Sequence, residues 1–123
     1  MNNGDVKSMA QEKQKYTKPT AIPGDVVPAR VSVLGAARSG LAAAQALAKR
    51  GVAVFISDTC DEKKLDFILA SNGLAHIAHE SQEHTVRVLR CEAIVLSPGI
   101  PAELPILNQA RRRGIPVWSE MEL

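Results

Sequence analysis

The stretch Arg30-Val-Ser-Val-Leu-Gly-Ala-Ala-Arg-Ser-Gly40 joins an apolar, β-branched run to a loop of small residues. The next residues, Leu41 to Arg50, carry apolar side chains at helical spacing. In a strand, glycine-bearing loop and helix of this kind, free N–H groups and a partial positive charge meet at the helix N-terminus. The stretch from Gly35 to Gly40 therefore predicts a phosphate-binding loop.

Outward from this unit the chain continues to alternate between apolar runs and amphipathic segments. Strands are predicted at Arg30–Leu34, Val52–Ile56, Leu74–Ala78, Ala93–Leu96 and Ile115–Trp118, and helices at Leu41–Arg50, Asp61–Asn72 and Leu104–Arg113, with a short helical segment around Val86 and Leu89. This pattern predicts an α/β fold: a Rossmann-like three-layer domain, whose five-stranded parallel sheet has the order 3-2-1-4-5 and helices on both faces.

The predicted strand order brings three loops to one edge of the sheet. Ligands of such sheets bind at the carboxyl edge, where the connections switch direction between the first and fourth strands. The loops concerned are Gly35 to Gly40, Ser57 to Asp61, and Ser97 to Pro101. A single binding site built from all three is the expected result.

The glycine loop supplies the strongest candidate residues. Gly35 and Gly40 allow close approach of backbone and ligand, Ser39 can donate its hydroxyl to a phosphate, and Arg38 adds a positive charge. Ala37 occupies the middle glycine position of the Gly-x-Gly-x-x-Gly pattern, which disfavours a pyrophosphate bound as in NAD domains. The alternative is a plain turn, with Ser39 as helix cap and Arg38 in solvent.

Asp58 and Thr59 follow the second predicted strand, about 20 residues beyond the glycine loop. An acidic residue at this place commonly accepts hydrogen bonds from a ribose or a base. Both residues could instead cap the turn before the next helix. We expect Asp58 to contact ligand, with Thr59 as a second polar contact.

The string Ser97-Pro-Gly-Ile-Pro101 forms the opposite wall of the expected site. Pro98 and Pro101 stiffen this loop, and Gly99 allows a positive φ angle that aims backbone groups into the crevice. A planar base could stack there, although a Pro-Gly turn alone indicates only a turn. Ser97 lacks the context of a catalytic nucleophile, and no catalytic residues are predicted.

Length, composition and charge limit the other possibilities. With 123 residues, 46% of them hydrophobic and 23% charged, the chain fits one globular domain. Residues 1–29 lack apolar periodicity and are predicted to be a flexible N-terminal arm or cloning remnant, with a short helix at Met9 to Tyr16 as the alternative. Residues 31–123 hold ten basic and ten acidic side chains, and aromatic residues make up 3% of the chain, so nucleic acid is a poor partner.

The remaining features carry little chemistry. No apolar run approaches the roughly 20 residues that span a bilayer, and no signal peptide is evident, so no membrane contact and a cytoplasmic location are expected. Cys60 and Cys91 are predicted at opposite edges of the sheet and hence as free thiols. The three histidines lack metal-like spacing, and Arg111 to Arg113 are interpreted as a solvated helix end, so no metal site is predicted.

Residues from about Val31 to Leu123 resemble the N-terminal domain of the Mur ligases, the cytoplasmic enzymes that build the peptidoglycan stem peptide. The resemblance rests on Val33-Leu-Gly-Ala-Ala-Arg-Ser-Gly-Leu-Ala42, Ser57-Asp-Thr59, Ser97-Pro-Gly-Ile-Pro101, and Gly114-Ile-Pro-Val117 leading to Glu120-Met-Glu-Leu123. The Ser-Pro-Gly-Ile-Pro string is similar to the branch of the family that adds D-glutamate to UDP-N-acetylmuramoyl-L-alanine.

The resemblance implies a role for each loop in holding the UDP end of that substrate. It implies that Arg38, Ser39 and Gly40 lie at the diphosphate, with Asp58 and Thr59 at the uracil and its ribose. Ser97, Pro98 and Gly99 would then lie on the other side of the base. Cys60 departs from the pattern, because some members have a basic residue there that covers the uracil.

The resemblance also implies that the reaction itself depends on other domains of a ligase chain, outside residues 30–123. Members continue into a central ATP-binding domain and a C-terminal domain, and they use ATP and Mg²⁺ for a reaction that these 123 residues are expected not to perform alone. The alternative interpretation is an NAD(P)-binding Rossmann domain of an oxidoreductase or a nucleotide-sensing regulator. A scaffold domain without nucleotide affinity is a third possibility.

Overall fold

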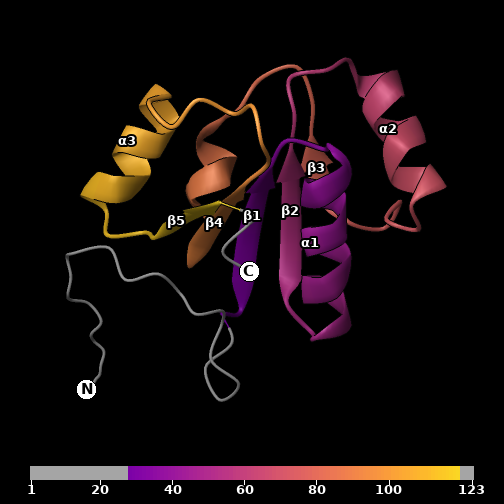
Figure 1. The fold of residues 1–123 in the computed structure, drawn as a ribbon, viewed down its shortest axis with the longest axis horizontal. Coiled ribbons are helices and arrows are strands. Elements are labelled where there is room, and N and C mark those ends of the chain that lie inside the picture. Colours follow the sequence, from indigo (N-terminus) through magenta and orange to yellow (C-terminus); the bar gives the residue numbers. More distant parts are fainter. Residues whose placement is uncertain (1–27, 120–123) are drawn as a thin grey trace.

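The computed structural model describes residues 28–119, which form alternating strands and helices (Figure 1). In chain order the elements are β1 (Arg30–Leu34), α1 (Arg38–Lys49), β2 (Ala53–Ser57), α2 (Glu62–Ser71), β3 (Ala78–Glu80), the 3₁₀ helix η1 (Val86–Leu89), β4 (Ala93–Leu96), α3 (Pro105–Arg112) and β5 (Val117–Ser119). Residues 1–27 of the predicted flexible arm, with the alternative helix at Met9 to Tyr16, and the Glu120 to Leu123 segment lie outside the described residues.

All five strands pair in parallel, in the order β3-β2-β1-β4-β5. The predicted fold class and strand order are thereby confirmed. The strands are apolar because helices cover both faces of the sheet: α1 and α2 lie on one side, and η1 and α3 on the other (Figure 1). The result is a three-layer Rossmann-like domain.

Alternate residues of each strand supply the two cores. Val31 and Val33 face the α1 and α2 side, whereas Leu34 belongs to the cluster beneath η1 and α3. The first core combines small and β-branched residues with leucines of α1 and α2 and with Leu74 and Trp118, all buried. Because alanines line the inner side of α1, this helix packs close to β1 and holds its N-terminus at the edge of the sheet.

The third strand lies later in the chain than the sequence predicts. Leu74 and Ile77 are core residues of a turn, where the Leu74 amide donates to Leu69 O (2.8 Å) and the Ile77 amide to Leu74 O (3.0 Å). The strand itself is Ala78–Glu80, with Ser57 opposite Glu80. The prediction of Leu74–Ala78 was wrong because an apolar turn and a short buried strand have the same local pattern.

The first helix also starts earlier than predicted. Its first intrahelical bond runs from the Leu41 amide to Ala37 O (2.8 Å), so Arg38, Ser39 and Gly40 form the first turn. The predicted loop from Gly35 to Gly40 is therefore a three-residue connection followed by helix. The bounds of β1 and β4 agree with the prediction, and the remaining elements differ from it by one or two residues at their ends.

Two further expectations concern the thiols and the membrane. Cys60 and Cys91 are both free and pack against different cores, on opposite faces of the sheet, which confirms the predicted absence of a bridge between them. Among residues 28–119, no helix has the length and apolar character needed to cross a bilayer.

Candidate functional site at the carboxyl edge of the sheet

The carboxyl ends of β1, β2 and β4 meet at one edge and are joined there by hydrogen bonds. Leu34 pairs with Ser57 on one side and with Leu96 on the other. Beyond the strands, the Gly35 amide donates to Ser57 O (2.8 Å) and the Ser97 amide donates to Leu34 O (2.9 Å). The three loops that the sequence singles out therefore begin side by side.

Gly35, Gly40 and Ser97 interlock at this edge. The Ser97 hydroxyl donates to Gly35 O (2.7 Å), and the Ser97 side chain is buried, with 3% of its surface exposed. A Cβ atom on Gly40 would lie 2.0 Å from Ser97 Oγ and 2.4 Å from Gly35 O, so only glycine fits. Gly35 itself has a φ angle of +96°, which favours glycine. These glycines let α1 start directly against the ends of β1 and β4.

The first turn of α1 presents backbone amides at this edge. Ala37 is the N-cap and has no side-chain cap, so the interpretation of Ser39 as a cap is wrong: Ser39 lies inside the first turn. Among residues 28–119, the amides of Arg38, Ser39 and Gly40 have no hydrogen-bond acceptor. The Arg38 side chain is exposed. Free first-turn amides of this kind bind anions.

Asp58 connects the ends of β2 and β1. Its Oδ2 accepts from the Ala36 amide (2.7 Å), and its Oδ1 accepts from the Cys60 amide (2.8 Å). Burial alone would raise the pKa of Asp58, but these two amide hydrogen bonds outweigh it and hold the pKa below its usual value. Asp58 is therefore a half-buried anion that shapes the glycine loop and retains lone pairs for a further donor.

The remaining predicted residues lie around these groups. Thr59 is exposed, as are Pro98 and Gly99 beyond the end of β4. The Ser97 hydroxyl is used within the protein, whereas the Pro98 and Gly99 backbone lies on the surface. The pKa of the Cys60 thiol is raised by burial and by its hydrogen bond to Asp58. No basic side chain takes the place that Cys60 occupies.

A buried polar network next to β2 was missed by the sequence reasoning. Glu80, with 8% of its surface exposed, accepts from Ser57 Oγ (2.7 Å), from the Thr85 amide (2.8 Å) and from the Thr85 hydroxyl. Ser57 Oγ also lies 2.7 Å from His84 Nδ1. Burial alone would raise the pKa of Glu80, but the hydrogen bonds from Ser57 and Thr85 lower it. Nothing in the local pattern marked these residues, because their contacts span two strands and a loop.

A groove of about 270 Å³ opens beside this network. Thr59, residues 82–84 and residues 104–106 line it, so its walls come from the ends of β2 and β3 and the start of α3. The backbone at Gln82 has a φ angle of +76°, and its amide donates to Cys60 O (2.9 Å). This bond fixes the loop after β3 against the loop after β2.

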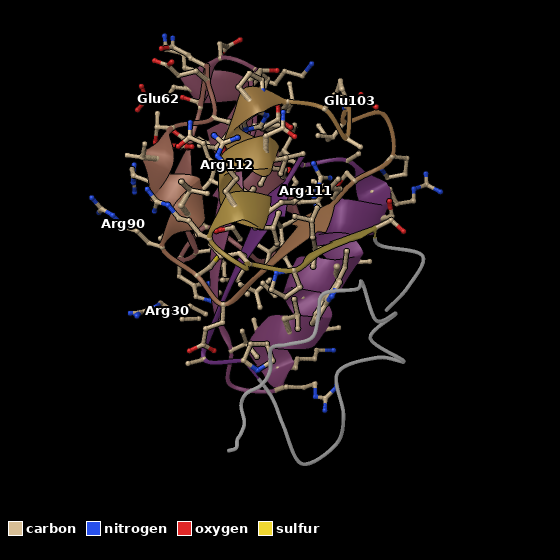
Figure 2. The ribbon with its side chains drawn as sticks, turned by 90° about the vertical axis from the view of Figure 1, so that its left-hand side faces the viewer. Arg30, Glu62, Arg90, Glu103, Arg111 and Arg112 are labelled. Atoms are coloured by element: carbon tan, nitrogen blue, oxygen red, sulfur yellow. The ribbon has the colours of Figure 1, made fainter. Side chains whose placement is uncertain are left out.

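Several arginines lie on other parts of the surface. Figure 2 shows Arg90, Arg111 and Arg112 on the outer side of η1 and α3, with Arg30 at the amino end of β1. Arg111, in the last turn of α3, donates to Ala102 O (2.8 Å) in the segment before that helix and to Asn108 Oδ1 (3.3 Å). Within residues 28–119 no group of three or more histidine, cysteine or acidic side chains could hold a metal ion.

The fold and this edge define the class of the protein as a Rossmann-like α/β domain, in which the carboxyl edge is the usual ligand side. The profile of one family, described as the Mur ligase MurD-like N-terminal domain, matches residues 29–119. The chain belongs to this family.

Individual relatives agree with the family profile. The chain is 40% identical over 100 residues to a UDP-N-acetylmuramoylalanine–D-glutamate ligase of Salinibacter ruber, a match that covers 81% of this chain and 21% of the relative. Ligases of the same name from Chlorobium phaeobacteroides and Elusimicrobium minutum are 41% and 38% identical, over 76% of this chain and 20% of each relative. The chain thus spans about a fifth of the length of these relatives.

Replacing Gly40 with alanine is expected to destabilise the domain by about 1–3 kcal/mol, because the added methyl group would overlap Ser97 Oγ and Gly35 O. Helix propensity alone predicts the opposite sign, a gain of about 0.5–1 kcal/mol. Urea unfolding measures the difference in unfolding free energy between the variant and the parent. The exposed Ala42→Gly change in the same helix is the control for helix propensity. A Gly40→Ala variant as stable as the parent would show that the interlock is not tight.

Replacing Glu80 with glutamine is expected to cost about 1–3 kcal/mol at pH 7, because charge-assisted hydrogen bonds from Ser57 and Thr85 are lost. The folded-state pKa of Glu80 lies below its unfolded value, so its stabilisation is complete above the unfolded pKa and is lost as pH falls through the folded one. Urea unfolding from neutral to acidic pH should show the unfolding free energies of the parent and the variant converging. The exposed Glu83→Gln variant is the control. A difference in unfolding free energy between the parent and Glu80→Gln that does not change with pH would contradict the role assigned to the Glu80 carboxylate.

Proposed function

We propose that this chain binds the UDP end of UDP-N-acetylmuramoyl-L-alanine, as the N-terminal part of a ligase that adds D-glutamate in peptidoglycan synthesis. The observation that carries the proposal is the first turn of α1. Its amides lack acceptors among residues 28–119 and lie at the carboxyl edge, where a diphosphate can approach. The identity of the proposed substrate is taken from the names of the relatives.

Each loop has a separate part in this binding. The amides of Arg38, Ser39 and Gly40 hold the diphosphate, and the Arg38 side chain adds a positive charge from solvent. Asp58, an anion with lone pairs to spare, accepts from the ribose or the base, and Thr59 adds a polar contact. The uracil lies between these residues and the Pro98 and Gly99 turn. Ser97 acts indirectly, because its hydroxyl holds Gly35 in place.

The rest of the ligase would supply the chemistry. ATP, with Mg²⁺, would transfer its terminal phosphoryl group to the substrate carboxylate and leave as ADP, and the amine of D-glutamate would then displace phosphate from the acyl phosphate. The described residues form no cluster fit for a metal ion, and the Ser57 hydroxyl beside His84 is fully buried and donates its hydrogen to Glu80. The part of residues 28–119 is to bind and orient the nucleotide in a cytoplasmic enzyme of cell-wall synthesis, without nucleic acid or membrane.

Isothermal titration with UDP, UMP, NAD and ATP tests the proposal. UDP should bind more tightly than UMP, because the α1 amides contact a second phosphate, and more tightly than NAD or ATP. Selective binding of NAD would instead favour a dinucleotide-binding oxidoreductase domain. A chain that binds none of the four would be a scaffold.

Two variants distinguish the contribution of the Arg38 backbone amide to phosphate binding from that of the Arg38 side chain. Arg38→Ala removes the charge alone, whereas Arg38→Pro also removes one N–H and suits the first helical position, where the preceding Ala37 is already extended. Arg38→Pro should bind UDP about tenfold or more weakly than Arg38→Ala, the value of a hydrogen bond to a charged group. Equal affinities would mean that this amide does not bind phosphate.

The 123-residue chain alone should release no phosphate from ATP when it is given UDP-N-acetylmuramoyl-L-alanine and D-glutamate. The physical reason is that the chemistry is proposed to lie in the rest of the ligase, of which this chain spans about a fifth. A phosphate-release assay measures this, and a full-length relative is the positive control. Turnover above the background rate would contradict the assignment of the chemistry to other domains.

A further inference from the structure

The outer side of η1 and α3 carries a concentration of positive charge. These two elements pack together over one core cluster, so their outward sides form one surface. Figure 2 shows Arg90, Arg111 and Arg112 on this side of the domain. We call the exposed arginines on and directly after η1 and α3 the arginine face, and its members are Arg87, Arg90, Arg111, Arg112 and Arg113.

Acidic residues do not balance the charge of the arginine face. Residues 84–91 and 104–113 contain none, although residues 31–123 as a whole hold ten basic and ten acidic side chains. Five of those ten basic side chains belong to the arginine face. The acidic residues nearest along the chain are Glu83, Glu92 and Glu103. The first lines the groove, the second accepts from a backbone amide, and the third precedes α3 at the end opposite its arginines.

The helix dipole explains only part of this arrangement. Positive charge is favourable in the last turn of α3, where Arg111 and Arg112 lie. The 3₁₀ helix η1 has only four residues and hence a small dipole, yet Arg87 lies within it and Arg90 directly after it. The positive charge on η1 therefore needs another explanation.

Three guanidinium groups of the arginine face have no partner among the described residues. Arg87 lies over the ring of Phe55, 4.7 Å from its centroid, and Arg111 is held by the segment before α3. The side chains without a hydrogen bond or ion pair within residues 28–119 are those of Arg90, Arg112 and Arg113. Each guanidinium has five N–H donors, so this surface can donate several hydrogen bonds to an external acceptor.

An exposed apolar side chain accompanies these arginines. Val86, the first residue of η1, has 58% of its surface exposed. Arginine is enriched in protein–protein interfaces, where lysine is depleted, and the arginine face contains no lysine. Single-stranded nucleic acid would stack on aromatic side chains, but the Phe55 ring on this side of the sheet is covered by Arg87. The composition of this surface therefore favours a protein partner.

We propose that the arginine face and Val86 form a docking site for an acidic segment of a partner protein. Carboxylates of that segment accept from the guanidinium groups, which suit bidentate binding, and an apolar side chain packs against Val86. The site is independent of the proposed UDP function. The arginines at the end of α3 lie toward the amino edge of the sheet, where β5 begins, whereas the nucleotide is proposed to bind at the carboxyl edge.

An NMR titration of the ¹⁵N-labelled chain with an acidic peptide tests the docking site. The probe is an acetylated peptide of glutamates on both sides of one leucine, and the same peptide with glutamine in place of glutamate is its control. Chemical-shift changes should concentrate on η1 and α3 with the acidic peptide and be absent with the control. A lack of changes on these two elements would overturn the proposal, as would displacement of the peptide by UDP.

Two double variants separate local binding from the overall charge of the chain. Arg90→Ala with Arg112→Ala should weaken binding of the acidic peptide about fivefold or more, the value of two exposed ion pairs. Lys63→Ala with Lys64→Ala removes the same charge from α2, on the other side of the sheet, and should change the affinity less than about twofold. Equal losses would mean that net charge alone attracts the peptide, and would overturn the proposal. UDP should bind the parent and both double variants equally, so failure here leaves the proposed function standing.

A second acidic peptide, in which serine replaces the leucine, tests the part of Val86. Val86→Ser should weaken binding of the leucine peptide about threefold and leave that of the serine peptide unchanged, because only the first pair makes an apolar contact. Equal effects on the two peptides would overturn the apolar contact. Vesicles that contain anionic lipid and an oligoadenylate of the same charge as the peptide are the other probes. If either binds the arginine face as tightly as the acidic peptide, the partner is not an acidic protein segment.

Discussion

The carboxyl edge depends on one close contact, that of Ser97 at the end of β4 with Gly35 and Gly40. Helix α1 can begin directly beside the ends of β1 and β4 only because neither glycine has a side chain to separate them. The hydroxyl of Ser97 satisfies Gly35 O inside that contact. The first-turn amides of Arg38, Ser39 and Gly40 are then left without acceptors among residues 28–119. A packing constraint thus leaves these amides free at the carboxyl edge, and no charged side chain is needed for that arrangement.

Two acidic groups, Asp58 and Glu80, continue the hydrogen-bonded edge toward β2 and β3. Each carboxylate joins a different set of segments. Both have a lowered pKa, because donors that converge on each carboxylate outweigh its burial. Asp58 joins the loops after β2 and β1, whereas Glu80 joins β2, β3 and the start of η1. The two carboxylates therefore fix the loops on which a nucleoside would rest. His84 lies between them and receives its orientation from Ser57.

The groove beside η1 follows from an unusual connection. Between β3 and β4 the chain has a single turn of 3₁₀ helix in place of a long helix. Arg87 of this turn lies over the ring of Phe55, 4.7 Å from its centroid, and Val88 and Leu89 fill the core. Since so short an element covers little of the sheet, the loops that follow β2 and β3 remain exposed at Thr59, Gln82 and Glu83. The start of α3 then supplies the opposite wall of the groove.

The sequence by itself determined the strand order, the two-faced sheet and the edge at which the loops meet. These follow from apolar periodicity and from the geometry of parallel connections, which are local and general. It could not place β3, because Leu74 and Ile77 look like a strand and only tertiary packing makes them a turn. Nor could it reveal that Ser39 is not a cap, that the Ser97 hydroxyl is already used, or that Ser57, Glu80 and His84 form a network. Those facts depend on distances between residues remote in sequence, which only the folded chain sets.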